Sequence, residues 1–163
     1  MRDFNHTVNV LVKAYLNDTL QRGNCYACAV GNMVAEACGY KLSKLEYYIT
    51  WINPVTECHQ DSWWLTAITN KSGLCIGEDD ENNVALGLEE IDSTGYTLEE
   101  LSRIEKAFEL RSGLLQNLES KHGKLSLQER IFHGLMAVID QLADIHQVDI
   151  SVREESKLLF IKQ

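Results

Sequence analysis

The sequence predicts a mainly α-helical, single-domain bundle, and three observations support this prediction. Residues 21–39 are small or apolar on nearly every side, which is typical of a helix in the middle of a core. Two later segments begin with capping boxes, at Thr97 and Ser126, and continue with apolar residues at helical spacing. With 163 residues and 45% hydrophobic composition, the chain is long enough for one core. We therefore expect residues 1–163 to form one globular domain.

Two helices are predicted in the first 39 residues. Residues 4–20 place apolar side chains at helical spacing, namely Val8, Leu11, Val12, Tyr15 and Leu16. After a short turn, the central helix is expected over about 24–38, with Asn24 as its N-cap and Gly39 as its left-handed end. Because the turn is short, the two helices should be antiparallel neighbours. Gly31 lies on a ridge of small residues, where we expect another helix to approach closely.

Further elements are predicted in the middle of the chain. Residues 43–52 predict a helix capped by Ser43, although their tail is rich enough in aromatic and β-branched residues for a strand to compete. Helices are also expected over 61–70 and 84–91, with a break at 92–95.

The second half of the chain predicts two long helices. Thr97 and Glu100 form a capping box, followed by the apolar stripe Leu101, Ile104, Ala107 and Phe108. A polar loop over 116–125 leads to a second box, Ser126 with Glu129, and a helix whose stripe is Phe132, Leu135, Met136, Val138, Ile139 and Leu142. The tail alternates at Val148, Ile150 and Val152, which predicts a small C-terminal β-hairpin.

Charge and hydropathy exclude several classes of function. A net charge of −9 and a pI near 5.0 argue against nucleic-acid binding, because the chain has no basic surplus with which to neutralise phosphates. No apolar run reaches the ~18 residues of a membrane span, and the N-terminus lacks the layout of a signal peptide. We expect a cytoplasmic protein whose five cysteines are reduced.

Three segments carry a resemblance to a known group of proteins. STGYTLEELSRIEKAFE and FHGLMAVIDQLADIH, together with CYACAVGN, resemble a set of small uncharacterised proteins of bacteria and their phages. The resemblance implies an origin in a phage or mobile element, but it implies no activity.

A second, local resemblance suggests a cysteine nucleophile. Gln21, Gly23, Cys25 and Cys28 resemble the Gln…Gly-x-Cys-x-x-Cys entry of papain-like proteases. The likeness implies that Cys28 is the nucleophile, that Gln21 helps form the oxyanion hole, and that His133 or His146 is the base. The spacing between Gln21 and Cys28 is one residue too long, and Ala29 replaces an expected aromatic residue. His146 also falls within an apolar stripe, where a packed imidazole is a natural alternative.

Metal sites are poorly supported by the sequence. Cys25 and Cys28, with Cys58, His59 or Cys75, offer zinc ligands, but one CxxC pair inside an apolar helix is a weak signal. We predict no metal and no cofactor. His133, Asp140 and Asp144 share one sector of their helix and are suited to a cation, a basic partner or simple solvation.

Aromatic residues suggest an interaction surface. Trp51, Trp63 and Trp64 lie within fourteen residues, which is more aromatic surface than one short element buries easily. The favoured function is therefore a small acidic interaction or accessory protein that binds a protein partner or a second copy of itself. The alternative is a cysteine-dependent hydrolase or transferase that uses Cys28.

Overall fold

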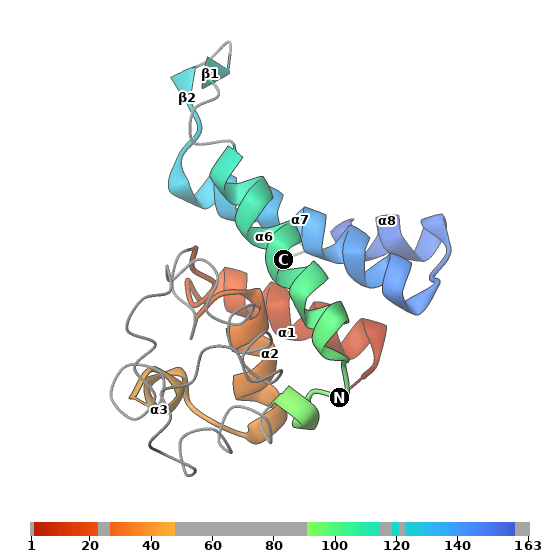
Figure 1. The fold of residues 1–163 in the computed structure, drawn as a ribbon. Coiled ribbons are helices and arrows are strands. Elements are labelled where there is room, and N and C mark those ends of the chain that lie inside the picture. Colours follow the sequence, from red (N-terminus) through yellow and green to blue (C-terminus); the bar gives the residue numbers. More distant parts are fainter. Residues whose placement is uncertain (1, 23–26, 48–90, 115–118, 121–122, 159–163) are drawn as a thin grey trace.

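The protein folds as an assembly of α-helices, as predicted (Figure 1). The computed structural model describes residues 2–22, 27–47, 91–114, 119–120 and 123–158. Their elements are α1 (Phe4–Leu16), α2 (Ala29–Cys38), α3 (Leu42–Tyr47), α6 (Leu98–Leu114), β1 (Glu119–Ser120), β2 (Gly123–Lys124), α7 (Leu127–His146) and α8 (Ile150–Leu158). The helices predicted over 61–70 and 84–91 lie outside these residues, apart from a last helical turn at 91–93.

α6 and α7 form the most extensively packed pair of described elements. They run antiparallel along one side of the molecule, and the two-residue strands β1 and β2 pair antiparallel at their far end (Figure 1). Both predicted capping boxes are present. The backbone N–H of Thr97 donates to Glu100 at 2.8 Å, and the N–H of Ser126 donates to Glu129 at 2.7 Å. These local signals therefore position the starts of both long helices correctly.

The predicted apolar stripes of α6 and α7 face a common core. Leu101, Ile104 and Phe108 are fully buried on α6. On α7 the fully buried residues include Leu135, Val138, Ile139 and Leu142, whereas Phe132 and Met136 are half-buried. One hydrophobic cluster joins these side chains to those of α1 and α2.

α1 is shorter than predicted. It begins after Asp3, whose carboxylate accepts from the N–H of His6 at 2.7 Å, and it ends at Leu16 rather than at residue 20. Asp18 adopts a left-handed conformation with φ of 56°, and Thr19 and Leu20 donate back to the carbonyl of Ala14. The reversal leaves Leu16 44% exposed and buries Leu20 instead, so the prediction of Leu16 as a core residue is wrong.

α2 ends as predicted but begins later. Gly39 takes the left-handed conformation, with φ of 65°, that stops the helix. The N-cap, however, is Cys28 in place of Asn24: residues 27–28 are not helical, and the Cys28 sulfur accepts from the N–H of Gly31 at 3.4 Å. Residues 29–35 of α2 are all buried, which agrees with a central helix. Asn24 itself lies outside the described residues.

α3 begins at Leu42, so Ser43 is inside the helix and is not its cap. The competing strand at 47–52 falls almost wholly outside the described residues.

The tail is a helix, which corrects the predicted C-terminal β-hairpin. α8 folds back along α7 after Gln147, which has a left-handed φ of 54°. Arg153 and Lys157 lie four residues apart and therefore share one face of α8, where they pair with Asp140 and Asp144 of α7.

None of the described helices combines the length and the apolar character that a membrane crossing requires.

Candidate functional site

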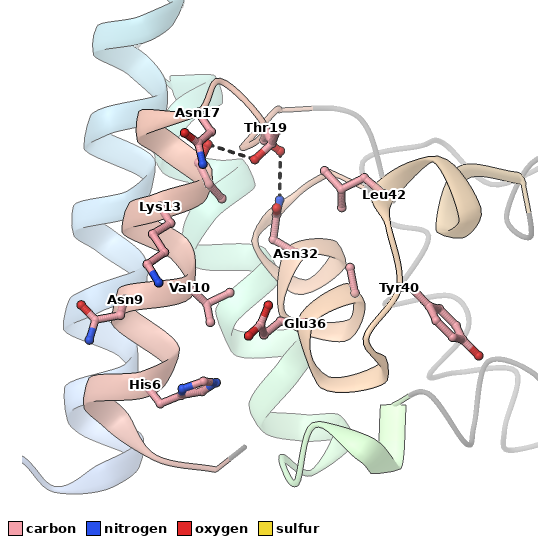
Figure 2. Close-up of a pocket in the computed structure, with 12 residues that line it drawn as sticks. His6, Asn9, Val10, Lys13, Asn17, Thr19, Asn32, Glu36, Tyr40 and Leu42 are labelled. Carbon is pink, nitrogen blue, oxygen red and sulfur yellow. Dashed lines mark hydrogen bonds between the residues drawn. The ribbon is translucent and has the colours of Figure 1, made fainter.

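A pocket of about 360 Å³ lies between α1 and α2 and is open to solvent (Figure 2). The two helices run in opposite directions along it, as the predicted hairpin requires, with His6 near one end and Asn17 near the other (Figure 2). The described residues that line the pocket are His6, Asn9, Val10, Lys13, Ala14, Asn17, Thr19, Asn32, Ala35, Glu36, Tyr40 and Leu42.

The helical repeat of α1 explains its wall of the pocket. Phe4, Val8, Leu11 and Val12 are buried in the core. The neighbouring face repeats at three to four residues with polar side chains, and this stripe consists of His6, Asn9, Lys13 and Asn17. A polar stripe does not exclude water from a helix contact, so the two helices leave a groove there.

Asn32 shapes the floor of the pocket from α2. It is only 7% exposed, and its side-chain nitrogen lies 3.0 Å from the Thr19 carbonyl, 2.8 Å from that of Ala27 and 3.0 Å from that of Cys28. The contact with Thr19 ties the start of α2 to the segment that connects α1 with α2 (Figure 2). No described residue donates to the Asn32 amide oxygen, which leaves this acceptor for a ligand.

Charges of both signs face the pocket. Lys13 and Glu36 are exposed, and neither forms an ion pair with another described residue. Residues 1–47, which supply all the described lining residues, contain five Lys or Arg against four Asp or Glu. Residues 48–163 contain ten against twenty. The described lining therefore comes from a nearly neutral part of an acidic chain.

The described lining residues carry few groups suited to covalent catalysis. The lining residues include neither cysteine nor serine, and the hydroxyl of Thr19 donates to the Ala14 carbonyl at 3.2 Å. His6 is the imidazole of the pocket, and no activated nucleophile accompanies it among the lining residues.

The structure places Gln21 beside Cys28 but His146 far from both. The N–H of Gln21 donates to the carbonyl of Ala27 at 2.8 Å, so Gln21 adjoins the start of α2 at the C-terminal end of α1. The ring of His146 contacts Phe4, at the N-terminal end of α1. α1 has 13 residues, and its two ends are separated by roughly 16–20 Å at 1.5 Å per residue. Cys28 and His146 are thus not assembled as a nucleophile and base.

Cys28 itself is 2% exposed and caps α2 through its sulfur. His133, the other proposed base, packs its ring against Phe132 with the ring centres 5.8 Å apart. The enzyme hypothesis stays a prediction that thiol labelling tests: a Cys28 that reacts rapidly in the native protein would support it, and an inert thiol would remove it.

Several other predicted site residues can be placed. Asp140 and Asp144 meet a basic partner within the chain, because Lys157 lies 2.8 Å from Asp140 and Arg153 lies 2.7 Å from Asp144. Trp51, Trp63 and Trp64 lie outside the described residues, as do the zinc candidates Cys25, Cys58, His59 and Cys75. In the described part of the chain, no three His, Cys, Asp or Glu side chains are grouped closely enough to hold a metal ion.

His146 is a packed imidazole, the alternative that its place in the apolar stripe indicated, but its hydrogen-bond partner was not predicted. Its Nε2 lies 2.7 Å from the hydroxyl of Tyr96, and that hydroxyl lies 2.9 Å from Oγ1 of Thr7. Tyr96 is 4% exposed and Thr7 is fully buried. Burial lowers the pKa of His146 and raises the pKa of Tyr96. The three residues come from three separate segments, and neither periodicity nor motif spacing links such distant positions.

Comparison of the chain with protein-family models, curated proteins and solved structures gives no match. Its function must therefore be inferred from the described residues themselves.

Proposed function

We propose that the protein is a small interaction or accessory protein that holds an extended, polar segment of a partner protein in the pocket between α1 and α2. The observation that carries this proposal is the lining of the pocket. Lys13 and Glu36 present opposite charges without an ion pair among the described residues, and the Asn32 oxygen is an open acceptor on the floor. A peptide segment supplies the complementary groups, because its amides donate and accept and its side chains carry either charge.

The dimensions of the pocket fit such a segment. The lining residues of α1 extend from His6 to Asn17, which at 1.5 Å per residue is about 16 Å along the helix. An extended chain rises about 3.3 Å per residue, so roughly five residues span this length. Exposed Asn9 and Asn17 side chains along the wall can pair with peptide groups over the same distance.

Charge favours a partner protein over nucleic acid or a second copy of the chain. A single lysine beside a glutamate does not neutralise a run of phosphates. Two copies that each carry a net charge of −9 repel one another. The resemblance to proteins of bacteria and their phages adds the proposal that the partner is encountered in a phage or mobile-element context.

Site-specific photocrosslinking tests this proposal. A photoreactive phenylalanine analogue is introduced at Asn9 in the pocket or at Glu155, which is exposed on α8. In the producing cells, we expect one covalent adduct from position 9 and none of the same mass from position 155. After mass spectrometry has identified the captured protein, calorimetry measures the affinity of the purified pair.

Two charge reversals then separate pocket binding from general charge effects. Glu36→Lys should weaken binding at least about tenfold, because it replaces attraction by repulsion at the contact. Glu155→Lys changes the net charge equally but lies away from the pocket, so affinity should stay within about twofold. Equal capture at both positions, an adduct with the mass of a dimer, or an unaltered affinity of Glu36→Lys would each contradict the proposal.

A further inference from the structure

Three side chains from three segments meet at the N-terminal end of α1. Thr7 comes from α1, Tyr96 from the turn before α6, and His146 from the last turn of α7. The Tyr96 hydroxyl joins the other two through the contacts of 2.9 Å and 2.7 Å. We call these three residues the clasp. It ties α1 to both long helices at a point where Thr7 and Tyr96 are buried from water.

Charged and aromatic groups surround the clasp on every side. Arg2 lies over the Tyr96 ring, 5.3 Å from its centre, and pairs with Glu100 of α6. Asp3 is the other charged group of the N-terminal segment whose field reaches His146. The Phe4 and Tyr96 rings meet the imidazole edge to face, with centres 6.0 Å and 5.5 Å away. Gly95, with φ of 75°, brings the turn close to Arg2.

Protonation of His146 fixes the direction of the hydrogen bonds in the clasp, because Nε2 can accept only in the neutral ring that carries its proton on Nδ1. With its proton on Nδ1, neutral His146 accepts from Tyr96 through Nε2, and Tyr96 in turn accepts from the Thr7 hydroxyl. An imidazolium donates from both nitrogens, so Tyr96 must then accept from His146 and donate to Thr7. The same step places a second cation beside the tyrosine that Arg2 already covers.

We infer that the clasp is a pH-sensitive device that fixes the N-terminal half of α1 when His146 is neutral and loosens it when His146 is protonated. The consequence for the pocket rests on the proposed function. His6 and Asn9, which line the pocket, lie one and two residues from Thr7. Loosening this part of α1 therefore moves one wall of the pocket and weakens its hold on a partner at low pH.

The surrounding ionisation states support a response centred on His146. Burial and the positive charge of Arg2 lower the pKa of His146, while Asp3 and Glu100 oppose this effect. The hydrogen bond from Arg2 lowers the pKa of Glu100 to about 2. The Arg2–Glu100 pair consequently keeps its charge over the range in which the imidazole titrates.

Hydrogen exchange tests the clasp without any partner. Amide exchange is measured at pH 7.5 and pH 5.5, with each rate divided by its intrinsic value, while NMR follows the His146 ring through the same range. We expect the protection factors of the amides of residues 6–10 to be at least about threefold lower at pH 5.5 than at pH 7.5. The pH midpoint of this decrease should equal the pH midpoint at which the His146 ring titrates. Amides of residues 101–108 on α6 should lose less protection.

Two histidine variants locate the response. His146→Gln should abolish the change in protection of residues 6–10, because it removes the titrating ring. His133→Gln is the matched control on the same helix and should retain the change. The clasp would be refuted by a constant protection in the wild type, by a midpoint different from that of His146, or by a response that survives in His146→Gln. Because no partner is present, this result is independent of the crosslinking result.

Discussion

The molecule contains two antiparallel helix pairs that use their facing surfaces differently. In the α6–α7 pair, Gly134 lets the ring of Phe108 approach so closely that a Cβ at Gly134 would lie 3.0 Å from that ring. In the α1–α2 pair, the facing stripe of α1 carries polar side chains and leaves a pocket of about 360 Å³. The same supersecondary unit is thus a filled core contact in one place and a candidate binding site in the other. The polarity of one helical stripe accounts for the difference.

Enlarging a small residue in each pair is the sharpest test of this contrast. Gly134→Leu forces a large side chain against Phe108 and the backbone of α6, and it should destabilise the fold by about 3 kcal/mol, the upper end of the usual overpacking cost. The melting temperature should fall by roughly 6–12 °C.

Ala35→Leu is the matched change in the pocket. Ala35 is 5% exposed and lines open space, so the added atoms can extend into the groove. We expect a cost of less than about 1 kcal/mol by urea unfolding. If the two substitutions lowered the free energy of unfolding equally, the α1–α2 pair would be packed as tightly as the α6–α7 pair.

Asn32→Ala should have the next largest effect. The substitution removes a side-chain donor from the carbonyls of Thr19, Ala27 and Cys28. The Ala27 and Cys28 carbonyls keep the backbone N–H groups of Gln21 and Asn32 as donors, so the loss falls mainly on Thr19, and we expect a cost of about 1–2 kcal/mol. Asn9→Ala, at an exposed position of the same pocket, should stay within about 0.5 kcal/mol. Urea titration of both variants gives the two values, and a neutral Asn32→Ala would show that the amide does not organise the turn.

Loss of a capping box should weaken the α6–α7 pair by less. In Ser126→Ala, the hydroxyl that accepts from the N–H of Glu129 at 3.2 Å is missing, and the expected cost is about 1 kcal/mol. Exposed Ser151 on α8 provides a control, since Ser151→Ala should change stability by no more than about 0.5 kcal/mol. Thermal unfolding followed by circular dichroism measures the stability of both variants. If Ser126→Ala and Ser151→Ala had equal effects, the capping box would not stabilise α7.

The smallest effect concerns the link between the two pairs, where Arg2 contacts Glu100. The pKa of Glu100 is about 2 in the folded protein and 4.5 for an ordinary glutamate, so the pair stabilises the fold above pH 4.5 and this contribution is lost as the pH falls toward 2. Because the Arg2 side chain is 40% exposed, solvent screens the pair, and we expect at most about 1 kcal/mol.

Urea unfolding at pH 5 and pH 3 measures this contribution. Glu100→Gln should lose less stability between the two values than the wild type, whereas Glu155→Gln should lose as much as the wild type. If Glu100→Gln lost as much stability between pH 5 and pH 3 as the wild type, the ion pair would not contribute to the stability of the fold.

Local sequence determined the boundaries that depend on a few adjacent residues. Thr97 with Glu100 and Ser126 with Glu129 satisfy orphan N–H groups within one turn, and Gly39 adopts a backbone conformation that other residues resist. The apolar stripes of α6 and α7 are likewise fixed by the helical repeat.

Boundaries that depend on distant contacts were not predictable from the sequence. α2 starts at Ala29 because Asn32 holds the carbonyls of Thr19, Ala27 and Cys28 in place. The tail is helical and places Arg153 and Lys157 against carboxylates of α7, a pairing invisible to the alternation of Val148, Ile150 and Val152. The Thr19 carbonyl and the α7 carboxylates lie in other parts of the chain, whereas Ala27 and Cys28 directly precede α2.

The sequence by itself determined which surfaces are apolar and where several helices begin and end, because capping and periodicity act over one or two turns. Only the tertiary structure decided that Gly134 marks a close approach of helices. It also placed His146 against Tyr96 and not against Cys28. The short turn predicted the hairpin of α1 and α2, but no local pattern showed that their facing stripes, 15–30 residues apart in the chain, leave a pocket between them.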